Sequence, residues 1–268
     1  MTVAEALQAR SYAREIVPGD VPGGPSTSQT IMVASLRRLL SLVPVDAPPD
    51  AYRFAVMKEN VLAKDTTSGR EWAFRQLRRF YSLDRNSLLF RALRDVWEHD
   101  PAGQALLASL CAIARDPVLR ASAAVILTTE PGAFVGASDF EAAIETAFPG
   151  AYKENTRRTT AKKIASSWAQ SGHLYAERPT RKVRVRVHPT PAAVAYALLL
   201  GHLQGARGQA LFSTLWAQVL DQPKSHLFDL AATASQHGIL EFRNAGGVVD
   251  VTFHHLLRPF DADQGPLL

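Results

Sequence analysis

Apolar residues in the first half of this chain recur with the period of an α-helix, and over no useful length with the two-residue period of a β-strand. Between residues 29 and 43, for example, Ile31, Leu36, Leu39 and Leu40 fall near one helix face. Further helices are expected over residues 50–64, 68–81, 87–99, 102–115 and 117–129. Residues 29–130 are therefore predicted to form an all-helical bundle.

Two stretches rich in proline and glycine bracket this bundle. Residues 18–25 hold three prolines and three glycines, so residues 1–28 are expected to be an N-terminal segment and linker. Pro131-Gly132 breaks the chain a second time. Residues 138–141 then have the spacing of a capping box, Ser138 to Glu141, which predicts a helix ending at Pro149-Gly150.

The helix expected over residues 155–172 has two chemically different faces. Ala161, Ile164, Ala165 and Trp168 have the i, i+3, i+4, i+7 spacing of a buried stripe. The opposite side carries polar and cationic side chains, namely Asn155, Arg158, Thr159, Lys162, Lys163, Ser166 and Gln170. Such a helix is expected to dock through its tryptophan and to turn its hydrogen-bonding side to solvent.

The two-residue alternation of a strand follows directly after this helix. Residues 182–188 alternate three valines with Arg184, Arg186 and His188, and residues 173–176 are expected to form the preceding strand. A helix pair followed by a basic hairpin is typical of winged-helix proteins, so residues 131–190 are predicted to be a winged-helix DNA-binding unit. The wing residues expected to meet phosphates are Arg178, Arg181, Lys182, Arg184 and Arg186.

Positive charge is concentrated in this same region. Residues 151–190 hold ten Lys and Arg and two acids, a net charge of +8, whereas the rest of the chain, with 20 basic and 23 acidic residues, has −3. Clustered cations create a local field that attracts polyanions. A run of solvated surface charges is the alternative interpretation.

The last part of the chain repeats the order of the preceding unit without its charge. Residues 191–268 are expected to form helices to about Leu203, around Trp216 and from Pro223 to Gly238, followed by a hairpin with its turn at Asn244–Gly247. This order predicts a C-terminal helical, winged-helix-like module used for packing or protein contact.

The sequence contains no recognisable arrangement for catalysis. The eight histidines are scattered, and the one cysteine, Cys111, cannot form an internal disulfide or a structural zinc site. No phosphate-binding loop, dinucleotide fingerprint or nucleophile elbow is present. We therefore expect no enzyme activity, no metal, no cofactor and no small-molecule substrate. No secretory signal or membrane-length apolar run is seen, so a cytoplasmic location with no membrane partner is expected.

A second group of arginines lies in the helical half of the chain. Arg70, Arg75, Arg78 and Arg79 are expected on the outer side of the helix over residues 68–81, with Arg85, Arg91 and Arg94 further along. Acidic neighbours such as Glu71 and Asp95 can pair with about half of them. This group is a candidate second basic surface.

Two segments resemble a known family. Residues 58–81, which read Lys58-Glu-Asn-Val-Leu-Ala-Lys and continue to Arg78-Arg-Phe-Tyr81, resemble a conserved stretch of the small helical BrxA proteins of bacteriophage exclusion (BREX) systems. Residues 155–174, with Ser166-Ser-Trp-Ala-Gln-Ser-Gly172, are similar to a later helix of that family. The resemblance covers about residues 30–175. It implies a non-catalytic DNA-binding component of a phage-defence operon, working beside a methyltransferase and ATPases.

The leading hypothesis is therefore a cytoplasmic, mostly helical protein that binds double-stranded DNA in phage defence. One alternative is a protein-interaction adaptor whose basic strip docks an acidic partner within a defence complex. Another is a winged-helix transcription regulator. A nuclease ranks behind these, because no cluster of carboxylates is available to hold its metal.

Overall fold

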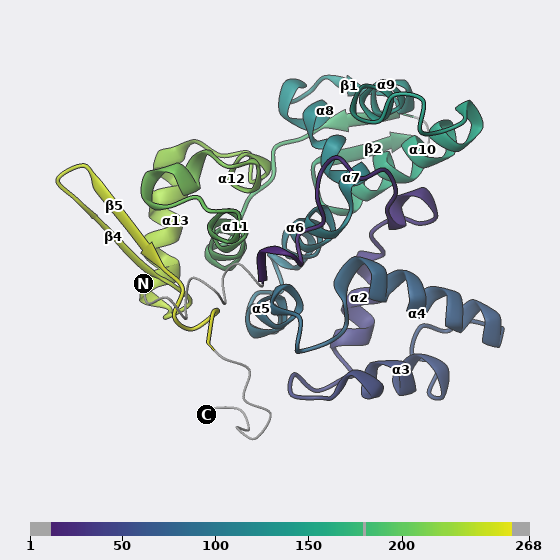
Figure 1. Cartoon of the computed structure of the whole chain (residues 1–268), viewed down its shortest axis with the longest axis horizontal. Coiled ribbons are helices and arrows are strands. Elements are labelled where there is room, and N and C mark those ends of the chain that lie inside the picture. The colour runs from purple at the N-terminus through teal and green to yellow at the C-terminus, as the bar shows by residue number, and fades with distance from the viewer. Residues whose placement is uncertain (1–11, 179–180, 259–268) are drawn as a thin grey trace.

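A computed structural model describes residues 12–178 and 181–258 of the chain (Figure 1). The described chain is mostly helical and carries small antiparallel hairpins, which confirms the predicted fold class at that level. The first half contains the 3-10 helix η1 (Pro25–Thr27) and helices α2 (Val33–Leu40), α3 (Pro49–Met57), α4 (Thr67–Tyr81), α5 (Leu88–Trp97), α6 (Gln104–Arg115), α7 (Pro117–Ala121) and α8 (Ala123–Thr128).

The second half mixes helices with short strands. Its first part contains β1 (Phe134–Val135), α9 (Ala137–Ala147), α10 (Glu154–Gln170), β2 (Leu174–Arg178) and β3 (Arg181–Arg184). Its last part contains α11 (Pro191–Leu203), the 3-10 helix η2 (Gly208–Ser213), α12 (Leu215–Val219), α13 (Lys224–Gln236), β4 (Glu241–Ala245) and β5 (Val248–Thr252).

Helices α6 and α11 form the centre of the molecule. Every side chain from Leu106 to Ala114 in α6 is buried, and α11 is buried on all sides because it packs against α5, α6, α12 and α13. Tyr196 of α11 donates its hydroxyl to the carbonyl of Leu89 at 2.9 Å, which satisfies the polar atom of a fully buried ring. A helix that is apolar all round is stable only in such a position.

Two helices end earlier than their apolar pattern predicts. The helix expected to reach residue 64 ends at Met57, because Asn60 and Ala63 adopt positive φ angles of 52° and 50° that no α-helix tolerates. The helix expected over residues 117–129 is divided into α7 and α8 at Ser122. The hydroxyl of Ser122 donates back to the carbonyl of Leu119 at 2.5 Å, a local bond that competes with helix continuation.

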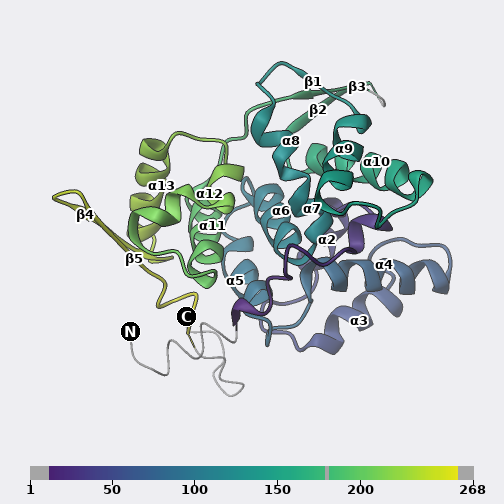
Figure 2. The same cartoon turned by 45° about the horizontal axis from the view of Figure 1, so that its top comes forward.

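Helices α9 and α10 pack on each other beneath a three-stranded antiparallel sheet (Figure 2). The strand order is β1-β3-β2. Val183 of the central strand β3 lies opposite Phe134 of β1 on one side and opposite Tyr175 of β2 on the other. Strand β1 has only two residues, which is too short to produce a periodic signal, and the sequence did not predict it. It brings the segment before α9 into the hairpin that follows α10.

The capping arrangement of α9 differs from the predicted one by two residues. The helix begins at Ala137, and the backbone N–H of Gly136 donates to the Asp139 carboxylate at 2.8 Å. Asp139 therefore takes the acceptor position that was expected for Glu141, and Ser138 lies inside the helix. The acidic side chain in the first turn also complements the helix dipole.

Residues 12–28 have little regular structure, but they lie against the helical body. The carboxylate of Glu15 accepts hydrogen bonds from the backbone N–H groups of Leu88 and Leu89, at 2.7 and 3.1 Å, and so caps α5. Ser26 donates its backbone N–H to the buried carboxylate of Asp116 at 2.6 Å. Several polar contacts therefore hold the described part of the expected linker in place.

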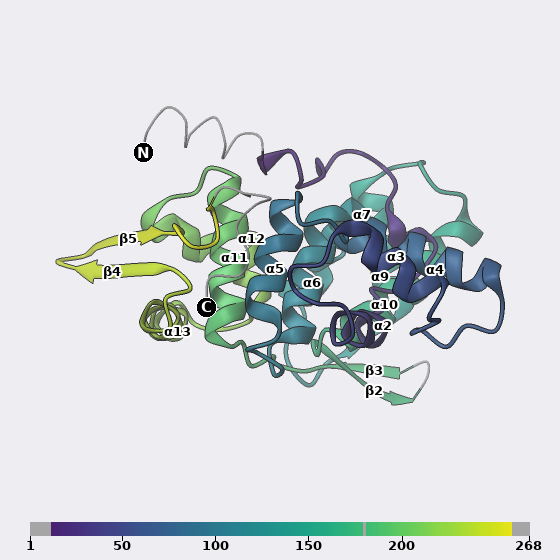
Figure 3. The same ribbon diagram turned by 90° about the horizontal axis from the view of Figure 1, so that it is seen from below.

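The hairpin of β4 and β5 projects from the end of the molecule that α11, α12 and α13 form (Figure 3). Its base is anchored by Val251 and Phe253, which are buried, while Val248 near the turn is exposed. No helix within the described ranges is both long enough and apolar enough to cross a membrane.

Candidate nucleic-acid interface

Helix α10 presents the polar face that its sequence predicts. Asn155, Arg158, Thr159 and Lys162 are exposed, and Lys163 and Ser166 are half-buried. With 100° between successive residues, these six side chains occupy one side of the helix. A straight helix with one polar, partly cationic side toward solvent can enter a groove of a nucleic acid.

The opposite side of α10 fixes the helix to the body. Ala161, Ile164 and Trp168 are buried, as their spacing predicts, and the indole N–H of Trp168 donates to the hydroxyl of Ser122 at 2.8 Å. Trp168 also packs edge-on against His173, with ring centroids 4.9 Å apart. The apolar burial and the indole hydrogen bond together hold the helix in one orientation.

One edge of the polar face is occupied by the N-terminal segment of the chain. The ammonium group of Lys163 donates to the carbonyl of Thr27 at 2.7 Å. One turn further, the Ser167 hydroxyl accepts from the backbone N–H of Ile31 at 3.2 Å. Lys163 therefore stabilises the packing of η1 on α10, and its charge is less available for a ligand than that of Lys162.

The hairpin after α10 carries exposed arginines at its outer end. Arg178 and Arg181 are opposite each other in the ladder, and both are exposed, as is Arg186 beyond β3. Lys182 is half-buried. The centre of the predicted wing tip, residues 179–180, lies outside the described residues. Strand β3 ends at Arg184, so the expected continuation of the strand to His188 is absent from the structure.

The prediction that Arg184 meets phosphates is wrong. Its side chain is 2% exposed and forms an ion pair with Asp221 at 2.8 Å, while its Nε donates to the carbonyl of Ile126 at 3.0 Å. The alternation of residues 182–188 suggested that Arg184 would lie on an outer cationic face. Helix α8, through the carbonyl of Ile126, and the segment after α12 cover that face instead, and Asp221 supplies the charge that allows the guanidinium to be buried.

Several other basic residues of this region have acidic partners on the protein itself. Ion pairs join Arg157 to Glu145 at 2.5 Å, Arg158 to Glu154 at 2.5 Å and Arg181 to Glu177 at 2.9 Å. The pairs of Arg158 and Arg181 are well exposed, so water and salt weaken them and each cation can exchange its partner for a phosphate. Five basic residues between positions 151 and 190 form no ion pair with any described acidic side chain: Lys153, Lys162, Lys163, Arg178 and Arg186.

The arginines of the first half divide into surface and structural groups. Arg75, Arg78 and Arg79 are exposed on α4, as predicted for a second basic surface. Arg70 is half-buried and donates to the carbonyls of Lys64 and Met57, at 3.3 and 3.2 Å, so it closes the loop between α3 and α4.

Arg91 and Arg94, which belong to the same stretch of basic residues, are buried with 2% of each residue exposed. Arg94 donates to the carbonyls of Leu40 and Val43, at 3.2 and 2.9 Å, and pairs with Glu98. These two arginines are therefore part of the helical packing and not of a ligand-binding surface.

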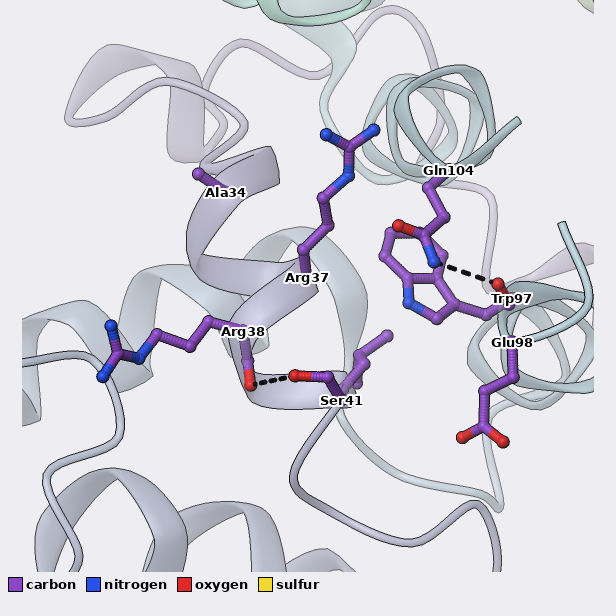
Figure 4. A pocket seen from close by; sticks show the side chains of 8 residues that line it. Ala34, Arg37, Arg38, Ser41, Trp97, Glu98 and Gln104 are labelled. Atoms are coloured by element: carbon purple, nitrogen blue, oxygen red, sulfur yellow. Dashed lines mark hydrogen bonds between the residues drawn. The ribbon is translucent and has the colours of Figure 1, made fainter. Parts of the chain in front are cut away.

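An open pocket of about 570 Å³ lies between α2, the end of α5 and the start of α6 (Figure 4). Arg37 and Arg38 extend from α2 on one side, and Trp97, Glu98 and Gln104 form the other side. The Gln104 amide donates to the carbonyl of Trp97 at 3.1 Å and so covers the end of α5. Trp97 itself is 2% exposed, which leaves the pocket without an aromatic face for stacking.

Two buried titratable groups, His173 and Cys111, have hydrogen-bond partners inside the fold. Burial lowers the pKa of His173 to about 4, and its ring nitrogens lie 2.7 Å from the Ser171 hydroxyl and 2.7 Å from the Val219 carbonyl. Burial raises the pKa of the Cys111 thiol to about 11. Within residues 12–178 and 181–258, no group of three or more His, Cys, Asp or Glu side chains is arranged to hold a metal ion.

Sequence reasoning missed the aromatic side chains on the outer face of the three-stranded sheet. Phe134 is 51% exposed, Tyr175 is 64% exposed, and the guanidinium of Arg181 lies 3.7 Å from the centroid of the Phe134 ring. The two rings are far apart in the sequence, and the unpredicted strand β1 brings them onto one sheet.

A search of the chain against models of protein families, curated proteins and solved structures found no match.

Proposed function

We propose that this protein is a non-catalytic component that binds double-stranded DNA through the winged-helix unit predicted over residues 131–190, extended at its start by helix α8. The proposal rests on one observation: one side of α10 is buried in the body, and the opposite side faces solvent. The helix is fixed to the body through Trp168 and turns Asn155, Arg158, Thr159 and Lys162 to solvent. Side chains of these types bind phosphates and base edges in the major groove.

The connectivity around α10 supports the winged-helix assignment. Helix α8, strand β1, helices α9 and α10 and the hairpin of β2 and β3 follow one another, and the sheet order is β1-β3-β2. A recognition helix followed by a hairpin can contact a groove and the neighbouring phosphates at once. In the proposed complex, the hairpin contributes Arg178, Arg181 and Lys182, and Arg186 lies just beyond it. Arg184 is excluded because it is buried.

The place of the protein in a BREX phage-defence system is part of the same proposal. It depends on the resemblance of residues 58–81 and 155–174 to BrxA proteins, and it implies a methyltransferase and ATPases as neighbours in the operon. An inspection of the genes beside this one tests it, since a large adenine methyltransferase and a very large ATPase are expected there. A neighbourhood without either enzyme would leave DNA binding in place and remove the assignment to defence.

Binding of random duplex DNA, followed by fluorescence anisotropy over a range of salt concentrations, tests the DNA-binding proposal. If the exposed cations Lys153, Arg158, Lys162, Arg178, Arg181 and Arg186 each neutralise one phosphate, the expected slope of log affinity against log salt is about −5. A folded protein that does not bind duplex DNA even at low salt contradicts the proposal.

An adaptor that docks an acidic protein partner is the second candidate function. The ion pairs of Arg158 with Glu154 and of Arg181 with Glu177 favour it, because they show that carboxylates fit beside these cations. The anisotropy titration separates the two functions. An adaptor is expected to show no salt-sensitive affinity for duplex DNA.

A further inference from the structure

The three-stranded sheet exposes a row of apolar side chains on its outer face. Phe134 of β1 is opposite Val183 of β3, and Val183 is opposite Tyr175 of β2. Residues directly opposite each other in a ladder point to the same face of a sheet. Phe134, Val183 and Tyr175 therefore form one row across all three strands.

The burial of the neighbouring residues shows that this row lies on the solvent-facing side of the sheet. Val135, one residue from Phe134, is 3% exposed, and Leu174, one residue from Tyr175, is 3% exposed, so these side chains point into the body. Because successive residues of a strand alternate between faces, the row of Phe134 and Tyr175 points to solvent. Their exposed fractions of 51% and 64% agree with this.

Cationic side chains border this aromatic row. Arg181 lies over the Phe134 ring, with its guanidinium carbon 3.7 Å from the ring centroid, and Arg178 is its partner across the ladder. The two aromatic strands are separated by β3, which places them about 10 Å apart, too far for the rings to cover each other. Arg181 covers one face of the Phe134 ring, but 51% of Phe134 and 64% of Tyr175 are exposed, so both rings remain accessible to a planar group from solvent.

We propose that the outer face of this sheet binds single-stranded nucleic acid, with unpaired bases stacked on Phe134 and Tyr175 and the phosphates held by Arg178 and Arg181. Flat aromatic groups beside cations match a ligand that has both planar bases and a negative backbone. A double helix has its bases stacked internally, so it cannot use the two rings in this way. The inference does not depend on α10, and its failure can be distinguished from a failure of duplex binding.

Binding of a fluorescein-labelled oligothymidylate, measured by anisotropy, tests the proposal on the full-length protein. Phe134→Ala and Tyr175→Ala are each expected to weaken binding by at least about fivefold, because stacking on an aromatic ring contributes at least about 1 kcal/mol per base. Phe134→Tyr and Tyr175→Phe keep a ring at each position and are expected to bind as the unchanged protein does.

Two further variants control for structure and location. Phe134→Leu keeps apolar volume on β1 but removes the ring. Weaker oligothymidylate binding by this variant is therefore expected from the loss of stacking and not from a disturbed sheet. Phe54→Ala removes an aromatic side chain of similar exposure, 56%, from α3 at a different surface, and it is expected to leave binding unchanged. Lys162→Glu on α10 is expected to weaken duplex binding and to preserve oligothymidylate binding.

Three results overturn the proposal. The first is no binding of oligothymidylate by the unchanged protein. The second is that Phe54→Ala weakens oligothymidylate binding as much as Phe134→Ala does. The third is that Phe134→Leu and Tyr175→Ala both keep the full affinity for oligothymidylate. Loss of duplex binding alone, with oligothymidylate binding and its dependence on the rings retained, contradicts only the function proposed for α10.

Discussion

Arg184 and Asp221 form an ion pair between the end of β3 and the segment after α12, with Nη2 and Oδ2 2.8 Å apart. The guanidinium is also satisfied by backbone carbonyls, including that of Ile126, so it joins three parts of the fold. The pair connects the candidate DNA-binding unit to the C-terminal helices. Arg184 has this structural role although its neighbours in sequence, Arg186 and Arg181, are on the surface.

Arg184→Ala is expected to lower the free energy of unfolding by about 3–5 kcal/mol, because it leaves a partly buried carboxylate and several carbonyls without their donor. Asp221→Ala should cost a comparable amount, since it leaves a guanidinium that is 2% exposed without its counter-charge. Urea denaturation measures both values. Arg186→Ala is the matched control on the exposed side of the same segment, and a cost equal to that of Arg184→Ala contradicts the assignment of Arg184 to the core.

Charge reversal on α10 should weaken duplex binding without unfolding the protein. Arg158 and Lys162 are exposed one turn apart, so the double variant Arg158→Glu with Lys162→Glu is expected to weaken duplex affinity by more than about tenfold and to reduce the salt slope by about 2. Lys163 is left intact because its ammonium group holds the carbonyl of Thr27. Anisotropy titrations measure the affinity, and circular dichroism checks the fold.

The arginines of α4 provide the control for that experiment. Arg75→Glu with Arg78→Glu changes the net charge of the protein by the same amount on a different exposed surface. If α10 is the main contact, this variant should retain most of the duplex affinity. Equal losses in the two double variants would mean that the basic surface of α4 contributes as much as α10, or that only overall charge matters, and either result would count against α10 as the main interface.

The stability of the protein should fall between pH 7 and pH 5 because of His173. Its pKa is about 4 in the folded protein and 6.5 when unfolded, so the unfolded chain binds the proton first as the pH falls through this range. The expected loss from this residue is about 2 kcal/mol between pH 7 and pH 5. The stability is therefore fully present above pH 6.5 and decreases toward pH 4.

Urea denaturation at both pH values, on the unchanged protein and on His173→Gln, measures this effect. The substitution lowers stability at pH 7, because hydrogen bonds to Ser171 and Val219 are lost or weakened. The difference in the free energy of unfolding between pH 7 and pH 5 should nevertheless become smaller by about 2 kcal/mol. His202, whose pKa burial also lowers to about 4, accounts for part of what remains. An unchanged pH dependence in His173→Gln would show that His173 is not the responsible group.

Gly24→Ala should destabilise the protein more than Gly23→Ala. Both glycines have positive φ angles, 156° and 118°, but a Cβ atom at Gly24 would lie 2.3 Å from a carboxylate oxygen of the buried Asp116, whereas nothing lies within 4 Å of one at Gly23. The clash would displace the carboxylate that accepts from Ser26 and caps α7 at Leu119. Thermal unfolding of the two variants measures the difference, and equal melting temperatures would contradict close packing of this segment.

The sequence by itself determined where most of the helices lie, though not where each of them ends, and which side of α10 is buried. Both follow from local periodicity, because residues three and four apart lie on one face of a helix wherever that helix sits. The stripe of Ala161, Ile164 and Trp168 and the hairpin after it are found at the places that the pattern indicates. These features need no knowledge of the rest of the chain.

The tertiary structure alone decided which polar and aromatic side chains reach the surface. The alternation of residues 182–188 gives each side chain a face, but only the positions of Ile126 in α8 and of Asp221 show that the face of Arg184 is covered. The pairing of β1 with β3 brings Phe134 into line with Tyr175, and η1 ties Lys163 to Thr27. Periodicity fixes how side chains are distributed around one element, whereas burial depends on contacts between elements far apart in the chain, and a local pattern carries no information about those contacts.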